Sequence, residues 1–148
     1  MRQEHFKINA VVVPEPNRLN ITFGDGITMV VDLSAIIDRT PAFSPLKNKD
    51  LFSRACVGEW GLTVDWIPGE LDMSGDNLRA EAIEQAGGIS HERIWEWMHR
   101  NGLTLVTAAE ALGISRRMLA YYRSGQKPIP KHIWLACVGW ETEQHKAA

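Results

Sequence analysis

The feature that most constrains this chain is a series of three short segments in its last third, each preceded by a hydroxyl residue and followed by a glycine. Ser90, Thr104 and Ser115 are the hydroxyl residues. Such side chains cap helix N-termini because their oxygen accepts an otherwise unpaired backbone N–H. Glycine ends helices because it adopts left-handed dihedral angles without strain. The predicted helices cover residues 91–101, 105–112 and 116–124, and the glycines that close them are Gly102, Gly113 and Gly125.

A fourth helix is predicted from Pro130 to about Glu141, because proline suits the first position of a helix. Before the first helix, Gly87 and Gly88 form a break in the chain. Paired glycines mark loops, so we expect two domains, at residues 1–86 and 89–148.

The part before this break has the alternating and β-branched patterns of short strands. Gly24, Asp25 and Gly26 predict a hairpin turn, and Ser34 is expected to cap a small helix at residues 35–38. A second helix is expected at residues 76–85. The predicted strands cover residues 5–13, 18–23, 27–33, 54–59 and 62–66. The fold class is therefore an α+β domain of short antiparallel strands and small helices, followed by an all-α domain.

Charge divides at the same place. Residues 1–88 contain 8 Lys/Arg and 13 Asp/Glu, whereas residues 89–148 contain 8 and 5, so the parts carry −5 and +3 within a total of −2. This asymmetry indicates that only the second part meets phosphate. The chain is 45% hydrophobic and 23% charged, as in a globular domain. It has no apolar run long enough for a membrane helix and no apolar signal core at the N-terminus. We expect a cytoplasmic protein, with Cys56 and Cys137 reduced and buried.

The spacing of small and apolar residues in the second and third predicted helices is that of a helix-turn-helix motif. Ala109 stands where two helices cross, Gly113 lies four residues later in the turn, and Leu119 lies six residues further on. A generic helical bundle would share the apolar spacing. The frame with Ser115 as a cap, inside a basic region, favours DNA binding.

The stretch from Leu103 to Pro130 resembles the Cro/lambda-repressor-like (Xre) helix-turn-helix family. The resemblance is carried by residues 103–105, 109–119, 122–125 and 128–130. It implies an all-α, lambda-repressor-like domain and a bacterial transcriptional regulator, most simply a repressor. One position departs from the family, since Leu105 stands where a glutamine is common.

The first part resembles a small bacterial α+β domain family of unknown function, over roughly residues 5–85. The segments that carry the resemblance are residues 21–26, 31–33, 43–46, 51–52, 59–61, 64–66 and 76–78. Members of that family are sometimes fused to a helix-turn-helix and sometimes encoded beside toxin-like partners. The resemblance implies a fold and a bacterial origin, and no biochemical activity.

The predicted DNA-binding residues lie at and around the helix at residues 116–124, whose N-terminal end should enter the major groove. We expect Arg116 or Arg117 to contact a base and the other to hold phosphate. Phosphate contacts are also expected from the ends of the neighbouring segments, with Arg123 as a further candidate. The whole set is Thr104, Ser115, Arg116, Arg117, Ala120, Tyr121, Ser124 and Lys127. A single domain of this size binds duplex weakly, so a homodimer is expected.

Two other classes of protein are possible. An enzyme is disfavoured because His91-Glu92 lacks the second histidine of a zinc-protease motif and Gly24-Asp25-Gly26 is not followed by the residues of a phosphate loop. No metal or cofactor is expected. The alternative function is an antitoxin that binds a toxin through the acidic N-terminal domain and regulates its own promoter. A pure protein adaptor would show no salt-sensitive affinity for DNA.

Overall fold

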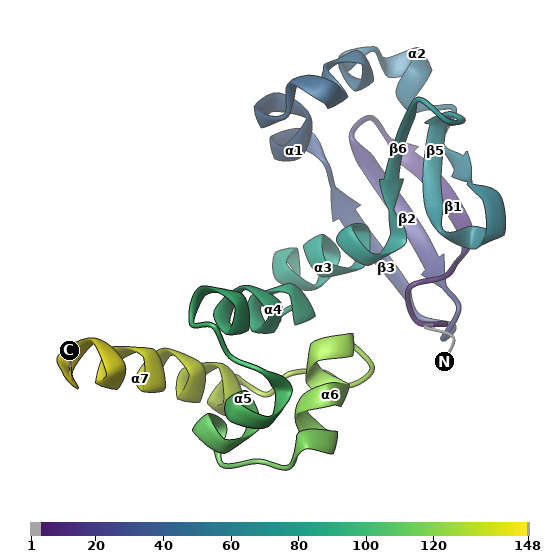
Figure 1. Cartoon of the computed structure of the whole chain (residues 1–148). Helices are drawn as coiled ribbons and strands as arrows, with labels where there is room; N and C mark the ends of the chain where they lie inside the picture. The colour runs from purple at the N-terminus through teal and green to yellow at the C-terminus, as the bar shows by residue number, and fades with distance from the viewer. Residues whose placement is uncertain (1–3, 148) are drawn as a thin grey trace. The chain divides into compact units, whose positions relative to one another are not determined.

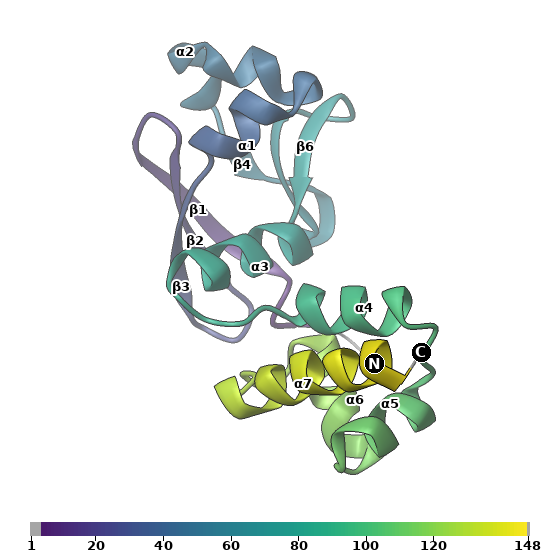
Figure 2. The same cartoon turned by 90° about the vertical axis from the view of Figure 1, so that its left-hand side faces the viewer.

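A computed structural model describes residues 4–147 of the chain. By its internal contacts the chain divides into two compact units, Met1–Ala86 and Gly87–Ala148. Figures 1 and 2 show an N-terminal α+β region with two small sheets, followed by a helical region. This confirms the expected order of an α+β part and an all-α part. Each unit is described by itself below.

The first sheet of the N-terminal unit is antiparallel, in the order β1-β2-β3. The strands are β1 (Ile8–Glu15), β2 (Arg18–Phe23) and β3 (Thr28–Asp32). Strand β2 begins and ends as predicted, because its buried residues Leu19, Ile21 and Phe23 alternate with more exposed ones. Strand β1 instead starts three residues later than expected and continues through Pro14. The pairing with β2 shifts register between Val12 and Glu15, and proline is tolerated at such an irregularity.

The second sheet contains β4 (Cys56–Val57), β5 (Thr63–Ile67) and β6 (Leu71–Ser74), paired in that order. Strand β6 was not predicted. Its four residues alternate between the buried Leu71 and Met73 and more exposed partners, a pattern too short to distinguish from a loop. The turn before β6 contains Gly69 with a φ of 77°. Cys56 is exposed, contrary to expectation.

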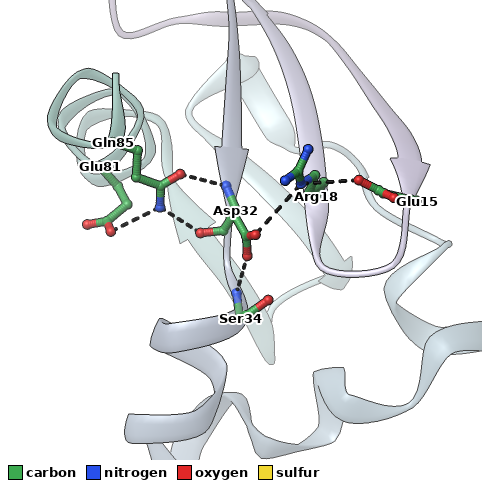
Figure 3. Close-up of polar contacts among 6 residues, drawn as sticks. All are labelled: Glu15, Arg18, Asp32, Ser34, Glu81 and Gln85. Carbon is green, nitrogen blue, oxygen red and sulfur yellow. Dashed lines mark hydrogen bonds and ion pairs between the residues drawn. The ribbon is translucent and has the colours of Figure 1, made fainter. Parts of the chain in front are cut away.

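The remaining elements of this unit are α1 (Ser34–Arg39), η1 (Pro41–Lys47), α2 (Lys49–Phe52), η2 (Glu59–Gly61) and α3 (Gly75–Gln85). The expected cap of α1 is wrong, because Ser34 is its first helical residue and Asp32 accepts the Ser34 amide at 2.8 Å. Figure 3 shows how Asp32 also joins β3 to α3. The Gln85 side-chain amide accepts the Asp32 N–H at 2.8 Å and donates to its carbonyl at 2.7 Å.

A buried arginine ties α3 to two segments that are distant in sequence. Arg79, 6% exposed, donates to the His5 carbonyl and to the Asp25 carboxylate, each at 2.7 Å. Its guanidinium also lies 5.0 Å from the centroid of the Phe23 ring. Burial raises the pKa of Asp25, but hydrogen bonds from Arg79 and the Ile27 amide outweigh it and hold that pKa below 3.8. Arg79 therefore fixes the β2–β3 turn and the N-terminal segment against α3.

Both sheets and the helices of this unit enclose one hydrophobic core. Trp66 and Phe52 pack with ring centroids 5.6 Å apart, and the Trp66 indole donates to the Phe52 carbonyl at 3.0 Å. The buried partner satisfies the indole N–H, so the large ring is buried without an unpaired donor.

The second unit consists of the helices α4 (His91–Arg100), α5 (Leu105–Leu112), α6 (Arg116–Ser124) and α7 (Lys131–Ala147). The predicted bounds of α5 and α6 are confirmed. The expected bounds of α7 are wrong at both ends. The Pro130 carbonyl accepts the Ile133 amide, so proline precedes the helix, and the polar residues after Glu141 continue it.

The core of this unit lies where the four helices meet, around Trp97, Leu119 and Cys137, each buried. Burial raises the pKa of the Cys137 thiol to about 12, so this cysteine is the inert, buried residue that was expected. Helix α7 is joined to the end of α4 by Glu141, which accepts hydrogen bonds from Asn101 at 2.6 Å and from Arg100 at 3.1 Å. Over residues 4–147, none of the helices has the length and apolar character needed to span a bilayer.

Candidate nucleic-acid interface

Three consecutive helices of the second unit end in the same hydrogen-bonded turn, the Schellman motif. At the end of α5, the Ile114 amide donates to the Ala109 carbonyl at 3.1 Å and the Gly113 amide donates to the Glu110 carbonyl at 3.2 Å. Gly113 has a φ of 69°, which only glycine adopts without cost. The same pairs of bonds close α4 at Gly102 and α6 at Gly125. These turns fix the direction in which each following helix starts.

The starts of α5 and α6 are fixed equally locally. The Ser115 hydroxyl accepts the Met118 amide at 3.1 Å, and the Thr104 hydroxyl accepts the Thr107 amide at 3.1 Å. Thr107 also accepts the Thr104 amide at 2.9 Å, which completes a capping box. The caps at Thr104 and Ser115 are confirmed, whereas the predicted cap at Ser90 is wrong, because its side chain makes no capping bond to α4. The role of Thr107 was not predicted, because the usual residue at this position is Glu or Gln.

Only three residues, Gly113 to Ser115, separate α5 from α6 (Figure 1). Ala109 and Leu119 are buried where the two helices pack, as the spacing predicted. Helix α6 therefore has one face held in the core and its N-terminal residues outside it. Ser115, Arg116 and Arg117 are exposed, whereas Ala120, Tyr121 and Ser124 are partly buried.

The surroundings of α6 are strongly basic. The 30 residues from Ala111 to Trp140 contain no Asp or Glu but five Lys or Arg. Arg116 extends from the first turn of α6, and within the described part of the chain it has no hydrogen-bond or ion-pair partner. A guanidinium with all of its donors available suits a bidentate acceptor.

Arg117 is arranged differently from its neighbour. Its Nε–H donates to the Tyr121 hydroxyl at 3.0 Å, one helical turn away. The ammonium of Lys127, in the loop after α6, lies 4.4 Å from the centroid of the same ring. The hydrogen bond from Arg117 and its charge hold the pKa of Tyr121 below 10.0, and Lys127 adds to this. Three of the predicted DNA-binding residues thus form one cluster, which we call the Tyr121 cluster (Arg117, Tyr121 and Lys127).

Two other predicted residues have internal roles. The Ser124 hydroxyl donates to the Tyr121 carbonyl at 3.2 Å and accepts the Gln126 amide at 3.4 Å, so it closes the turn after α6. Arg123 stacks on the half-exposed Trp95 of α4, 4.7 Å from the ring centroid. This stacking joins α6 to α4 and was not predicted.

The N-terminal unit has a separate hollow of about 770 Å³. Trp60 lines this cavity and has 77% of its surface exposed. Its φ of 61° is a left-handed conformation that is strained for a bulky residue. Leu62 is 61% exposed beside it. The lining residues are Glu4, Phe6, Lys7, Trp60, Leu62, Thr63, Ser74 and Asp76.

Comparisons with known proteins agree with the expectation for the first part. Residues 8–84 match the family described as "Protein of unknown function (DUF2442)". Among solved structures, the chain is similar to the "Putative DNA Binding Protein NE0471" of Nitrosomonas europaea, with a TM-score of 0.85 and 47% sequence identity. That similarity covers 91% of this chain and 86% of the other. No curated protein matches the chain.

Proposed function

The chain belongs to the DUF2442 family, and from this premise we propose that it is a sequence-specific DNA-binding protein that regulates transcription, most simply as a repressor. In this proposal α5 and α6 are a helix-turn-helix of the Cro/lambda-repressor-like type. Helix α6 enters the major groove with its N-terminal end, as recognition helices of this motif do.

The main support for the proposal is the exposed, basic N-terminal end of α6. Leu119 and Tyr122 seat the helix on the core, while Arg116 and Arg117 lie on its exposed side. An arginine at this position can donate two hydrogen bonds to guanine O6 and N7. The related protein of Nitrosomonas europaea, itself described as a DNA-binding protein candidate, supports the same function.

The residues around α6 supply the contacts to the DNA backbone in this proposal. Lys127 is exposed in the loop that follows α6, and Thr104 and Ser115 are exposed at the starts of α5 and α6. Helix N-termini present free backbone N–H groups to phosphate oxygens. Backbone contacts of this kind position the protein without reading sequence. The role requires no catalysis and no cofactor.

The proposal includes a two-fold dimer. One helix-turn-helix contacts few bases, and dimers of this class read two half-sites about 34 Å apart on one face of the duplex. Selection of duplexes from a random pool should therefore yield a palindromic site. Sedimentation of the complex should show two chains per duplex.

The test is a paired substitution at the start of α6. The R116A/R117A variant should keep its fold and lose affinity for the selected duplex by at least about tenfold, because guanine contacts of this kind are worth ~1–3 kcal/mol each. The matched control is K47A/K49A, which also removes two exposed cations but from the N-terminal unit. Equal losses in both variants, or no loss in either, would refute the assignment of α6.

The exposed Trp60 and Leu62 favour a second function for the N-terminal unit, binding of a protein partner. Apolar side chains exposed beside a cavity often mark such surfaces, and this is the surface that an antitoxin would offer to its toxin. The test is co-expression with the products of the genes adjacent to its own. Copurification that is lost in a W60S/L62S variant would support this function, and the absence of any copurified product would refute it.

A further inference from the structure

The Tyr121 cluster places two cations around one partly buried phenol ring. Arg117 Nε–H donates to the hydroxyl at 3.0 Å, and its guanidinium carbon lies 5.7 Å from the ring centroid. Lys127 Nζ lies 4.4 Å from the same centroid. The two positive side chains come from different segments, the first turn of α6 and the loop after it, so the ring of Tyr121 brings together charges that would otherwise repel each other.

This arrangement leaves several donors without an acceptor. The Tyr121 oxygen accepts from Arg117, so its own O–H remains available to donate. Arg117 uses Nε for this bond and keeps the N–H groups of its two terminal nitrogens. Lys127 contributes a full charge, and within residues 4–147 neither Lys127 nor Arg117 forms an ion pair with a carboxylate. Convergent donors with net positive charge form an anion site.

We propose that the Tyr121 cluster binds one phosphodiester group of the DNA backbone, which leaves Arg116 as the arginine that reads a base. This inference rests on the proposed function and gives the two adjacent arginines different roles, phosphate binding for Arg117 and base contact for Arg116. A phosphate accepts hydrogen bonds from several directions, which suits a tethered arginine, a phenol and an ammonium grouped together. A base edge is planar and narrow, which suits the side chain of Arg116, whose donors are all free.

Tyr121 acts in this site both as a ligand and as a positioning residue. Its hydroxyl donates to the phosphate, and the same oxygen restrains the Arg117 side chain before DNA arrives. Pre-ordering a long side chain removes part of the entropy that binding would otherwise cost. The Y121F variant removes both effects while it retains the ring on which Lys127 lies.

The experiment measures affinity for two duplexes with the full chain. One is the duplex that the wild-type chain selects from a random pool, and the other is its scrambled sequence. Binding is followed by fluorescence anisotropy between about 50 and about 200 mM salt, the range over which phosphate contacts are weakened. The variants are Y121F, R117A and R116A, with K146A as a control that removes an exposed cation of the same unit outside the cluster.

The proposal predicts that Y121F and R117A weaken binding to both duplexes by the same factor, about 3- to 10-fold, and that R117A lowers the salt slope by about 1. R116A should weaken binding to the selected duplex by about 10-fold and leave the scrambled duplex almost unchanged. K146A should resemble the wild type.

Three outcomes would overturn the inference, and they are distinguishable. If R117A abolishes discrimination between the duplexes while R116A does not, the two arginines have the opposite roles. If Y121F binds like the wild type while R117A is weakened, the tyrosine is not part of the site. If the wild-type chain enriches no duplex from the random pool, the proposed function fails together with this inference.

Discussion

The two units of this protein are stabilised over very different distances along the chain. In the N-terminal unit, Arg79 joins α3 to Asp25 and His5, which are 54 and 74 residues away in sequence. In the C-terminal unit, the bonds that set the direction of α5 and α6 join residues three to five positions apart. Local bonds define a helix pair without reference to the rest of the chain, whereas the sheets depend on a few distant side chains.

Loss of the Arg79 side chain should have the largest effect and should be confined to the N-terminal unit. The Arg79→Met variant retains apolar bulk but leaves the Asp25 carboxylate and the His5 carbonyl without this partner. Arg79 is buried but Asp25 is partly open to solvent, so removal of this partner should cost on the order of 2 kcal/mol, less than in a fully buried ion pair. Hydrogen exchange of the full chain should show lost protection in residues 8–85 and unchanged protection in α4 to α7. Arg54→Met, at an exposed site, is the control, and equal loss of protection in both units would contradict the comparison.

Among the local bonds of the C-terminal unit, those of the turn between α5 and α6 should lose the most stability on substitution. Gly113→Ala forces a side chain into a left-handed conformation with a φ of 69°, at a cost of about 1–2 kcal/mol. The control is Gly139→Ala within α7, where an added Cβ meets nothing within 4 Å and alanine should stabilise the helix by about 0.5–1 kcal/mol. Thermal unfolding of the C-terminal unit measures both, and effects of the same sign would show that the turn is not constrained as described.

Removal of the α6 cap should cost less. Ser115→Ala leaves the Met118 amide without its acceptor, which should destabilise the C-terminal unit by about 1 kcal/mol. Ser115→Asn should restore the stability, because asparagine caps equally well. Hydrogen exchange of the first turn of α6 distinguishes the variants. If asparagine behaves like alanine, the cap is not the origin of the loss.

The smallest effect should appear in acid, at the contact between α4 and α7. Hydrogen bonds from Asn101 and then Arg100 hold the pKa of Glu141 below its ordinary value of 4.5. Because the pKa of Glu141 is lower in the folded than in the unfolded protein, its contribution to stability is complete above pH 4.5. This contribution is lost as the pH falls through the pKa of Glu141 in the folded protein. The wild-type C-terminal unit should therefore lose stability in this window, and Glu141→Gln should lose less. If stability depends on pH in the same way in both proteins, Glu141 is not the group responsible for the loss in acid.

The sequence predicted what depends on neighbouring residues. Ser115 and Gly125 bound α6 as expected, because a cap and a left-handed glycine act within one turn of the helix. Strand β6 and the role of Arg79 were missed for the opposite reason. The partners of Arg79 lie in distant segments that the fold brings together, so no local sequence pattern predicts them.

The candidate site divides in the same way. The placement of Arg116 and Arg117 outside the core followed from helical spacing. The hydrogen bond from Arg117 to Tyr121 joins residues four positions apart, so their proximity was predictable but their side-chain conformations were not. The position of Lys127 over the ring depends on the turn at Gly125, which the sequence indicated only as a helix end.

NMR titration of the full chain with the selected duplex would show whether α6 is the surface that contacts DNA. The largest amide shifts should fall in residues 115–127, with smaller ones near Thr104 and little change in residues 8–85. Shifts centred in the N-terminal unit, or none at saturating duplex, would contradict this role of α6.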